Sequence, residues 1–383
     1  MVGRKLLSRM DAQLRDAFPE KQNEIFGGCS ILLLGDFAQL PPVGDVPLFN
    51  LHPQVRGNPE TVMASNKGRA LYMSLTESIT LDRIMRQQGE DPPAVQFRQV
   101  LSNLQSMEAT EPDRQFLNTR YVGDLSAEDL AGFEDALHLC PTNALVDEIN
   151  ESKMSSSGKP VITLLARNKG PEASNASDDD AEGLAEKLLL MEGAKVMLTR
   201  NIWTTKGLTN GSIGSIGTTF NSRNSLTLQK VSSLLQNKPH TKTFRDIMVA
   251  MPGYKGPTLW HKEDGTPIVP IVSFTARWQS KSGKQCLCTQ FPLRVAYAVT
   301  IHKSQGMTLN KAVVELGDYD FTWGLTFVAI SRVRGIRDIV FRSEIGSERL
   351  QKLGGSTNLL KEDIIRRGRL NFIDAEELEF LLN

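Results

Sequence analysis

The most informative stretch of this 383-residue chain is Leu32-Leu33-Leu34-Gly35-Asp36-Phe37-Ala38-Gln39-Leu40-Pro41-Pro42-Val43. The apolar run that begins at Ile31 predicts a strand buried on both faces. It ends in a polar loop that Pro41 and Pro42 stiffen, because proline restricts φ. Ligands of open α/β sheets bind just beyond the carboxyl ends of the strands, so Gln39 indicates a binding site. A core strand that ends in a proline-rich turn without function is the alternative.

Two later segments also combine polar motifs with apolar runs. The first is Ala298-Val299-Thr300-Ile301-His302-Lys303-Ser304-Gln305-Gly306-Met307-Thr308-Leu309, which precedes an apolar run at 312–316. The second is Thr326-Phe327-Val328-Ala329-Ile330-Ser331-Arg332-Val333-Arg334-Gly335, which precedes a strand-like run at 338–341. In this order the three segments resemble the G-D-x-x-Q-L-P-P-V loop, the H-K-S-Q-G loop and the A-x-S-R-x-R helix of the Pif1-like and RecD-like DNA helicases of superfamily one. Three motifs in register over about 300 residues make the resemblance specific.

The resemblance implies an α/β fold, the RecA-like P-loop NTPase fold of helicases. Residues 1–130 would then be the C-terminal part of a first RecA-like domain, and residues 131–217 with 291–383 a second RecA-like domain. Residues 218–290 are rich in Gly, Pro, β-branched and aromatic residues without helical periodicity, which suits a small β domain. In the family this place is taken by an inserted SH3-like module, and irregular loop is the alternative.

Local patterns predict several elements. Apolar residues at helical spacing indicate an amphipathic helix over Gly3–Phe18. Pro, Asn and Gly dominate the stretch Leu51–Lys67, which therefore reads as a loop. Strand-like residues 195–199 and 212–217 bracket Asn210-Gly211, a dipeptide that favours a type I′ hairpin turn.

Hydrolysis of a nucleoside triphosphate requires neutralisation of the γ-phosphate and orientation of the attacking water. Gln39 suits the second task, because its amide can donate to phosphate and accept from water. Asp36 could hold Gln39 or join a magnesium shell. The resemblance implies ATP and Mg²⁺ as cofactors, and places Gln39, Arg86 and Arg332 at the γ-phosphate, with Arg332 as an arginine finger that reaches across an interdomain cleft. A turn-capping glutamine and two surface charges are the alternative.

The His302 loop suits contact with a nucleic acid. His302 and Ser304 can donate to phosphates and Lys303 supplies charge, while glycine at 306 allows close backbone approach. The resemblance implies that this loop couples DNA contact to the nucleotide cleft, and it places Asn143 near the bound strand. A structural histidine is the alternative for position 302.

No Walker A motif occurs in the sequence. The pattern G-x-x-x-x-G-K-[ST] fails at Gly158-Lys159 and at Gly283-Lys284, and no strand ends in an Asp-Glu pair. In the family the acidic pair lies shortly before a helix, and here a helix follows Met1-Val2-Gly3. We therefore expect the sequence to begin just after that motif, and the isolated chain to hydrolyse ATP negligibly. No metal site is predicted, because Cys286 and Cys288 lack zinc spacing.

Bulk properties set further bounds. Lys plus Arg and Asp plus Glu are 44 each, so any electropositive track for DNA must be local. No apolar run is long enough for a membrane span, and the amino terminus lacks a secretory signal. We expect an intracellular protein, nuclear in a eukaryote or else mitochondrial, of undetermined oligomeric state.

The leading interpretation is an ATP-dependent DNA helicase. The resemblance implies 5′ to 3′ movement on single-stranded DNA, DNA junctions as further partners, and roles in DNA repair, recombination and telomere maintenance. One alternative is a catalytically inactive nucleic-acid-binding remnant of a helicase or mobile element, which would use only the His302 loop and the β insertion. A nucleotide-independent interaction scaffold is another.

Overall fold

The computed structural model describes residues 2–372 except 82, 107, 171–172, 177–179, 218–245, 281, 318–319, 321, 348 and 350–353. Part of the predicted insertion, 218–245, therefore lies outside the described residues. The chain forms two compact units, residues 1–133 with 308–383 and residues 134–307. The first boundary is close to the one predicted at 130. Residues 308–383 group with the first segment instead of with 134–307, and the predicted RecA-like domain borders stay a prediction.

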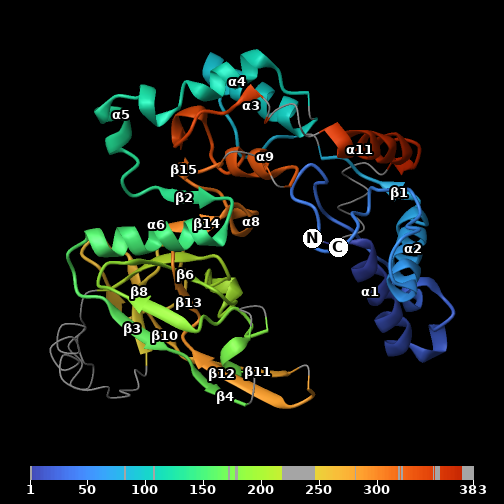
Figure 1. The fold of residues 1–383 in the computed structure, drawn as a ribbon, viewed down its shortest axis with the longest axis horizontal. Helices are drawn as coiled ribbons and strands as arrows, with labels where there is room; N and C mark the ends of the chain where they lie inside the picture. The colour runs from blue at the N-terminus through green and yellow to red at the C-terminus, as the bar shows by residue number, and fades with distance from the viewer. Residues whose placement is uncertain are drawn as a thin grey trace. The chain divides into compact units, whose positions relative to one another are not determined.

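The first unit is mainly helical (Figure 1). Its helices include α1 (Arg4–Ala17), α2 (Pro59–Met73), α3 (Pro92–Gln105), α4 (Glu111–Asn118), α5 (Ala127–Ala131), α9 (Leu325–Ile330) and α11 (Gly354–Arg367). Its strands include β1 (Glu77–Ser78), β15 (Ala312–Val314), β16 (Ile339–Phe341) and β17 (Asn371–Phe372). The pairs β1–β17 and β15–β16 are both parallel. The predicted helix at 3–18 and the predicted strands near 312 and 338 are thus confirmed.

Helix α2 corrects the predicted loop over Leu51–Lys67. Asn58 caps the helix by accepting from the backbone N–H of Glu60 at 2.8 Å, and Pro59 occupies the first turn. This start signal was present in the sequence. α2 packs beside α1 (Figure 1), and a Cβ on Gly68 would lie only 1.9 Å from the carbonyl oxygen of Arg4. The two helices therefore approach as closely as glycine allows.

The strand predicted at Ile31–Leu34 is not formed. Ile31 and Leu33 pack on the core of the first unit, but Leu32 is 53% exposed and Leu34 82% exposed. The alternation of a strand is therefore present, with one face covered instead of two. The physical reason is a lack of pairing, because a strand needs a hydrogen-bonded neighbour and none of the described strands pairs with this segment.

The second unit is mainly β. Its parallel pair joins β2 (Leu137–Cys140) and β14 (Ala298–Thr300), and α6 (Asn143–Ser156) packs against both strands (Figure 1). The short helix α8 (Ile301–Ser304) follows β14. A six-stranded antiparallel sheet has the order β13 (Leu293–Val295), β6 (Lys195–Leu198), β7 (Ile213–Ile216), β8 (Asp246–Ala250), β10 (Pro267–Val272) and β9 (Trp260–His261). A three-stranded sheet has the order β11 (Phe274–Gln279), β12 (Gln285–Gln290) and β4 (Arg167–Lys169), and β3 (Ile162–Leu165) pairs with β5 (Lys187–Leu190).

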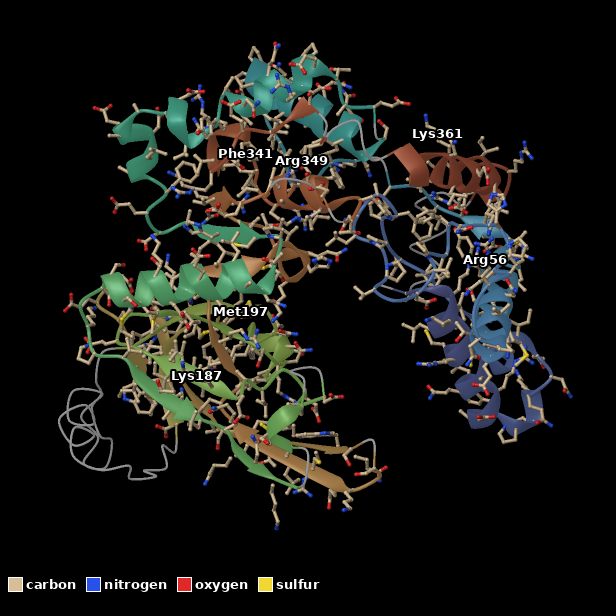
Figure 2. The ribbon with its side chains drawn as sticks, viewed as in Figure 1. Arg56, Lys187, Met197, Phe341, Arg349 and Lys361 are labelled. Carbon is tan, nitrogen blue, oxygen red and sulfur yellow. The ribbon has the colours of Figure 1, made fainter. Side chains whose placement is uncertain are left out.

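This β region is continuous with its surroundings. β8 from the predicted insertion pairs with β7, and β12 pairs with β4, so strands on both sides of the predicted border share sheets. The core contains buried side chains from strands on both sides of this border, among them Val196 of β6 and Val249 of β8. Met197 of β6, labelled in Figure 2, is also buried. The hairpin of β6 and β7 is confirmed, but its turn is not of type I′. Gly211 has a φ of +89°, whereas Asn210 has no positive φ.

Candidate functional site

The loop after Leu34 is organised around the carboxylate of Asp36. This carboxylate accepts from the backbone N–H of Ala38 at 2.9 Å and from the side-chain amide of Gln39 at 3.3 Å. The side-chain amide of Gln105, on α3, also lies 3.4 Å away from it. Asp36 therefore positions Gln39, one of the two roles that the sequence suggested for it.

Gly324 places this loop against the start of α9. Gly324 is the N-cap of α9 and has a φ of +79°, a conformation that glycine adopts readily. A Cβ at this position would lie 2.8 Å from the carbonyl oxygen of Ala38 and 3.0 Å from that of Gln39. The Gln39 loop and the helix that leads to Arg332 are thus in direct contact within the first unit.

Arg332 is buried without a carboxylate in contact. Its side chain is 2% exposed, and it donates to the carbonyl oxygen of Val328 at 2.8 Å and to the hydroxyl of Ser331 at 2.6 Å. Burial, followed by the charge of Arg86, lowers the pKa of Arg332 to about 10, and the charge of Asp36 opposes this shift. Arg332 therefore stays charged at neutral pH while lacking an ion-pair partner among the described residues.

Arg86 reaches the same place from another part of the chain. Its guanidinium donates to the hydroxyl of Thr308 at 3.0 Å and to the carbonyl oxygen of Ser331 at 2.7 Å. Burial lowers the pKa of Arg86. Since both arginines donate to Ser331, two like charges are held close together, and the charge of Asp36 lies near that of Arg332.

Gln87 was missed by the sequence analysis. It is 7% exposed, and its amide donates to the carbonyl oxygens of Ser331 at 3.2 Å and Val333 at 2.7 Å. The amide thus fixes the backbone on both sides of Arg332. The only signal in the sequence was its position next to Arg86.

The first unit therefore brings together the four residues predicted at the nucleotide: Asp36, Gln39, Arg86 and Arg332. Two guanidinium groups with one carboxylate leave an excess of positive charge beside the buried Arg332, where electrostatic interactions are stronger than in water. Guanidinium forks and an amide are suitable ligands for a terminal phosphate. The arrangement fits the γ-phosphate of a nucleotide, although the role of each residue stays a prediction.

The residues predicted to contact nucleic acid lie in the second unit. Thr300 of β14 is paired with Cys140 of β2 in a parallel register, so Asn143 and His302 both follow the carboxyl ends of adjacent strands. Two side chains cap the helices there: Thr142 accepts from Leu145 at 3.4 Å, and Thr300 accepts from Lys303 at 3.3 Å. Asn143 and His302 therefore lie at the same edge of the parallel pair β2–β14.

The side chains of this loop differ in exposure. Asn143 and Lys303 are exposed and His302 is half-buried, and burial lowers the pKa of His302. Ser304 is 0% exposed and donates to the carbonyl oxygen of Ile301 at 2.8 Å. Its hydroxyl therefore has a helix-internal partner in this conformation, and its contact with phosphate stays a prediction. Gly306 has a φ of +86°, and a Cβ there would meet open space.

The described residues contain no group of three or more His, Cys, Asp or Glu that could hold a metal ion. All four cysteines are free thiols. In the part of the chain that the structure describes, no helix is both long enough and apolar enough to span a membrane.

Known proteins are similar to this chain over most of its length. Residues 1–113 match the family model of PIF1-like helicases. The ATP-dependent DNA helicase Pif1 of Campylobacter jejuni is 26% identical, over 81% of this chain and 62% of its own length. The human ATP-dependent DNA helicase PIF1 is 26% identical over 88% and 44%, and an uncharacterised protein of Invertebrate iridescent virus 6 is 29% identical over 83% and 66%. The chain thus spans less than two thirds of these relatives.

Solved structures show the same fold. A Pif1 helicase from Bacteroides in complex with ADP-AlF3 and single-stranded DNA superposes with a TM-score of 0.66 at 22% identity, covering 96% of this chain and 74% of that chain. A structure of two coordinating Pif1 helicases at forked double-stranded DNA gives 0.64 at 24% identity, covering 96% and 72%. The predicted α/β fold of the RecA-like type is thereby confirmed.

Proposed function

We propose that this chain, which is similar in sequence to Pif1 helicases and shares their fold, contributes to the activity of an ATP-dependent DNA helicase. Its first unit senses the terminal phosphate of ATP, and its second unit holds single-stranded DNA. The observation that supports this proposal most is the meeting of Gln39, Arg86 and Arg332, which are far apart in the sequence, around Ser331 and Asp36.

Each residue has a role that its geometry permits. The guanidinium groups of Arg86 and Arg332 would neutralise charge on the γ-phosphate, which is the main electrostatic demand of phosphoryl transfer. Gln39, held by Asp36, would orient a water. ATP with Mg²⁺ supplies the reactive phosphoryl group when bound. Asn143, His302 and Lys303 would contact phosphates of single-stranded DNA, with Ser304 supporting helix α8, which carries His302 and Lys303.

The resemblance to Pif1-like helicases also supports proposals on the direction of movement, the DNA substrate and the cellular role. We propose 5′ to 3′ movement, action at DNA junctions, and roles in DNA repair, recombination and telomere maintenance. The location would be one where DNA is kept, the nucleus or mitochondrion in a eukaryote. A second candidate is an inactive nucleic-acid-binding remnant of a helicase or mobile element, because Asn143 and His302 lie in the second unit, whereas Gln39 and Arg332 lie in the first.

The nucleotide role is tested by the affinities of fluorescent ATP and ADP analogues, measured with and without Mg²⁺. If the chain functions as proposed, it should bind the ATP analogue more tightly than the ADP analogue, and Arg86→Ala should abolish this preference. Equal affinities for the two analogues, or no binding of either, would favour the remnant.

The DNA role is tested by fluorescence anisotropy with a labelled oligothymidylate at several salt concentrations. Removal of the Lys303 charge by Lys303→Ala should weaken binding and lower the slope of log affinity against log salt by about 1. Lys187→Ala is the matched control, because Lys187 is an exposed lysine of the same unit on β5 (Figure 2). Equal effects of the two substitutions would contradict a specific role of the His302 loop.

A further inference from the structure

Phe37 links the Gln39 loop to the rest of the first unit. It lies between Asp36 and Gln39, and its ring centroid is 6.1 Å from that of Tyr72 and 5.5 Å from that of Phe49. Phe49 is 2% exposed, and its ring centroid lies 5.4 Å from that of Trp323. Trp323 precedes Gly324, which contacts Gln39. A displacement of Phe37 would therefore move the residues on both sides of it.

Helix α11, near the C-terminal end of the sequence, contacts two of these aromatic residues, Tyr72 and Phe37. The carboxylate of Asp363 is fully buried and accepts from the hydroxyl of Tyr72 at 3.0 Å and from Arg367 at 2.8 Å. The guanidinium carbon of Arg367 lies 5.4 Å from the ring centroid of Phe37. Arg366 donates to the carbonyl oxygen of Tyr72 at 2.8 Å. Burial, followed by the charge of Asp363, raises the pKa of Tyr72, so its hydroxyl remains a donor at physiological pH.

We propose that α11 is a positioning element of the nucleotide site. Asp363 orients Tyr72 and Arg367, and these two side chains hold Phe37 so that Asp36 and Gln39 face Arg332. Asp363, Tyr72 and Arg367 are positioning residues, since they act through Phe37 and do not contact the nucleotide. The role in nucleotide sensing rests on the proposed function, whereas the ordering of the loop does not.

Two substitutions test the inference on the whole chain. Tyr72→Phe keeps the ring beside Phe37 but removes the hydroxyl, and Asp363→Asn removes the charge that binds Arg367. The first readout is hydrogen–deuterium exchange of the backbone amides of Ala38 and Gln39, which donate within the loop at 2.9 and 3.2 Å. We expect exchange about tenfold faster, the effect of losing one hydrogen bond to a charged group.

The second readout is the preference for the ATP analogue over the ADP analogue. It should fall in both variants while ADP affinity is unchanged, because ADP lacks the phosphate that Gln39 and Arg332 would bind. Arg367→Lys keeps the cation over Phe37 and should restore most of the protection that Arg367→Ala loses. Lys361→Ala is the control, since Lys361 lies on the same helix (Figure 2) in an exposed ion pair with Glu108.

The outcomes are distinct. If α11 only stabilises α2, exchange rises in α2 and α11 alone while residues 36–39 and the ATP preference stay as in the wild type, and the inference is wrong. If the wild type binds neither analogue, the proposed function fails, and exchange at residues 36–39 still decides whether α11 positions the loop. Circular dichroism melts verify that each variant is folded.

Discussion

Arg332 and Arg349 are two buried arginines of the first unit with different surroundings, and we predict different effects on stability when each is replaced by methionine. Arg332, 2% exposed, donates only to the uncharged oxygens of Val328 and Ser331. Arg349, 6% exposed and labelled in Figure 2, forms a buried ion pair with Asp320. Methionine has a similar length and no charge, so each substitution removes mainly the guanidinium.

The magnitudes follow from these contacts. The surroundings that lower the pKa of Arg332 to about 10 disfavour its charged form by about 3 kcal/mol. Loss of its two hydrogen bonds, which come from a charged donor, costs about 1.5 kcal/mol each. The two effects nearly cancel, so Arg332→Met should leave the free energy of unfolding within about 1 kcal/mol of the wild type. Arg349→Met should lower it by about 3 to 5 kcal/mol, because it leaves the buried carboxylate of Asp320 unpaired.

Thermal and urea unfolding, followed by circular dichroism, measure both effects. We expect Tm to stay within about 2 °C of the wild type for Arg332→Met and to fall by about 10 °C for Arg349→Met. The same Arg332→Met protein should lose its preference for the ATP analogue. A large loss of stability in Arg332→Met, comparable to that of Arg349→Met, would refute the reasoning, since the guanidinium would then serve the fold and not a ligand.

Two further predictions concern His302 and Gly324. Burial lowers the pKa of His302, so the unfolded chain binds a proton at a higher pH than the folded chain. The free energy of unfolding should therefore fall as the pH drops from about 7 to 5. His302→Gln should flatten this pH dependence, which urea unfolding at a series of pH values measures. If the variant and the wild type show the same pH dependence, His302 is not the responsible group. Gly324→Ala should lower the free energy of unfolding by about 2 kcal/mol, because alanine is strained at a positive φ and its Cβ would clash with the backbone at Ala38. Gly306 has a similar φ, but a Cβ there would meet open space. Gly306→Ala should therefore lower the free energy of unfolding by about half as much. Equal losses in the two variants would mean that the contact between Gly324 and the loop contributes nothing.

Short-range signals predicted many of the elements. The amphipathic spacing before Phe18 indicated α1, and the apolar runs near 312 and 338 indicated β15 and β16, because each pattern depends on neighbouring residues alone. The Asn-Gly pair indicated a hairpin but not the φ of Asn210, since a longer connection separates the strands. The prediction of a loop over residues 51–67 was wrong, because it relied on composition and overlooked the helix start signal at Asn58-Pro59.

Motif residues were found from their order in the sequence, but their surroundings were not. A pattern of letters can name Gln39 and Arg332, yet it holds no information on Ser331 as a shared acceptor, on Gln87 beside it, or on the buried hydroxyl of Ser304. The exposure of Leu34 was equally unpredictable, because an apolar run is the same whether or not a partner strand covers it. Hydrogen-bond partners and burial arise from contacts between residues far apart in the chain, and the energy of those contacts depends on positions that no local pattern contains.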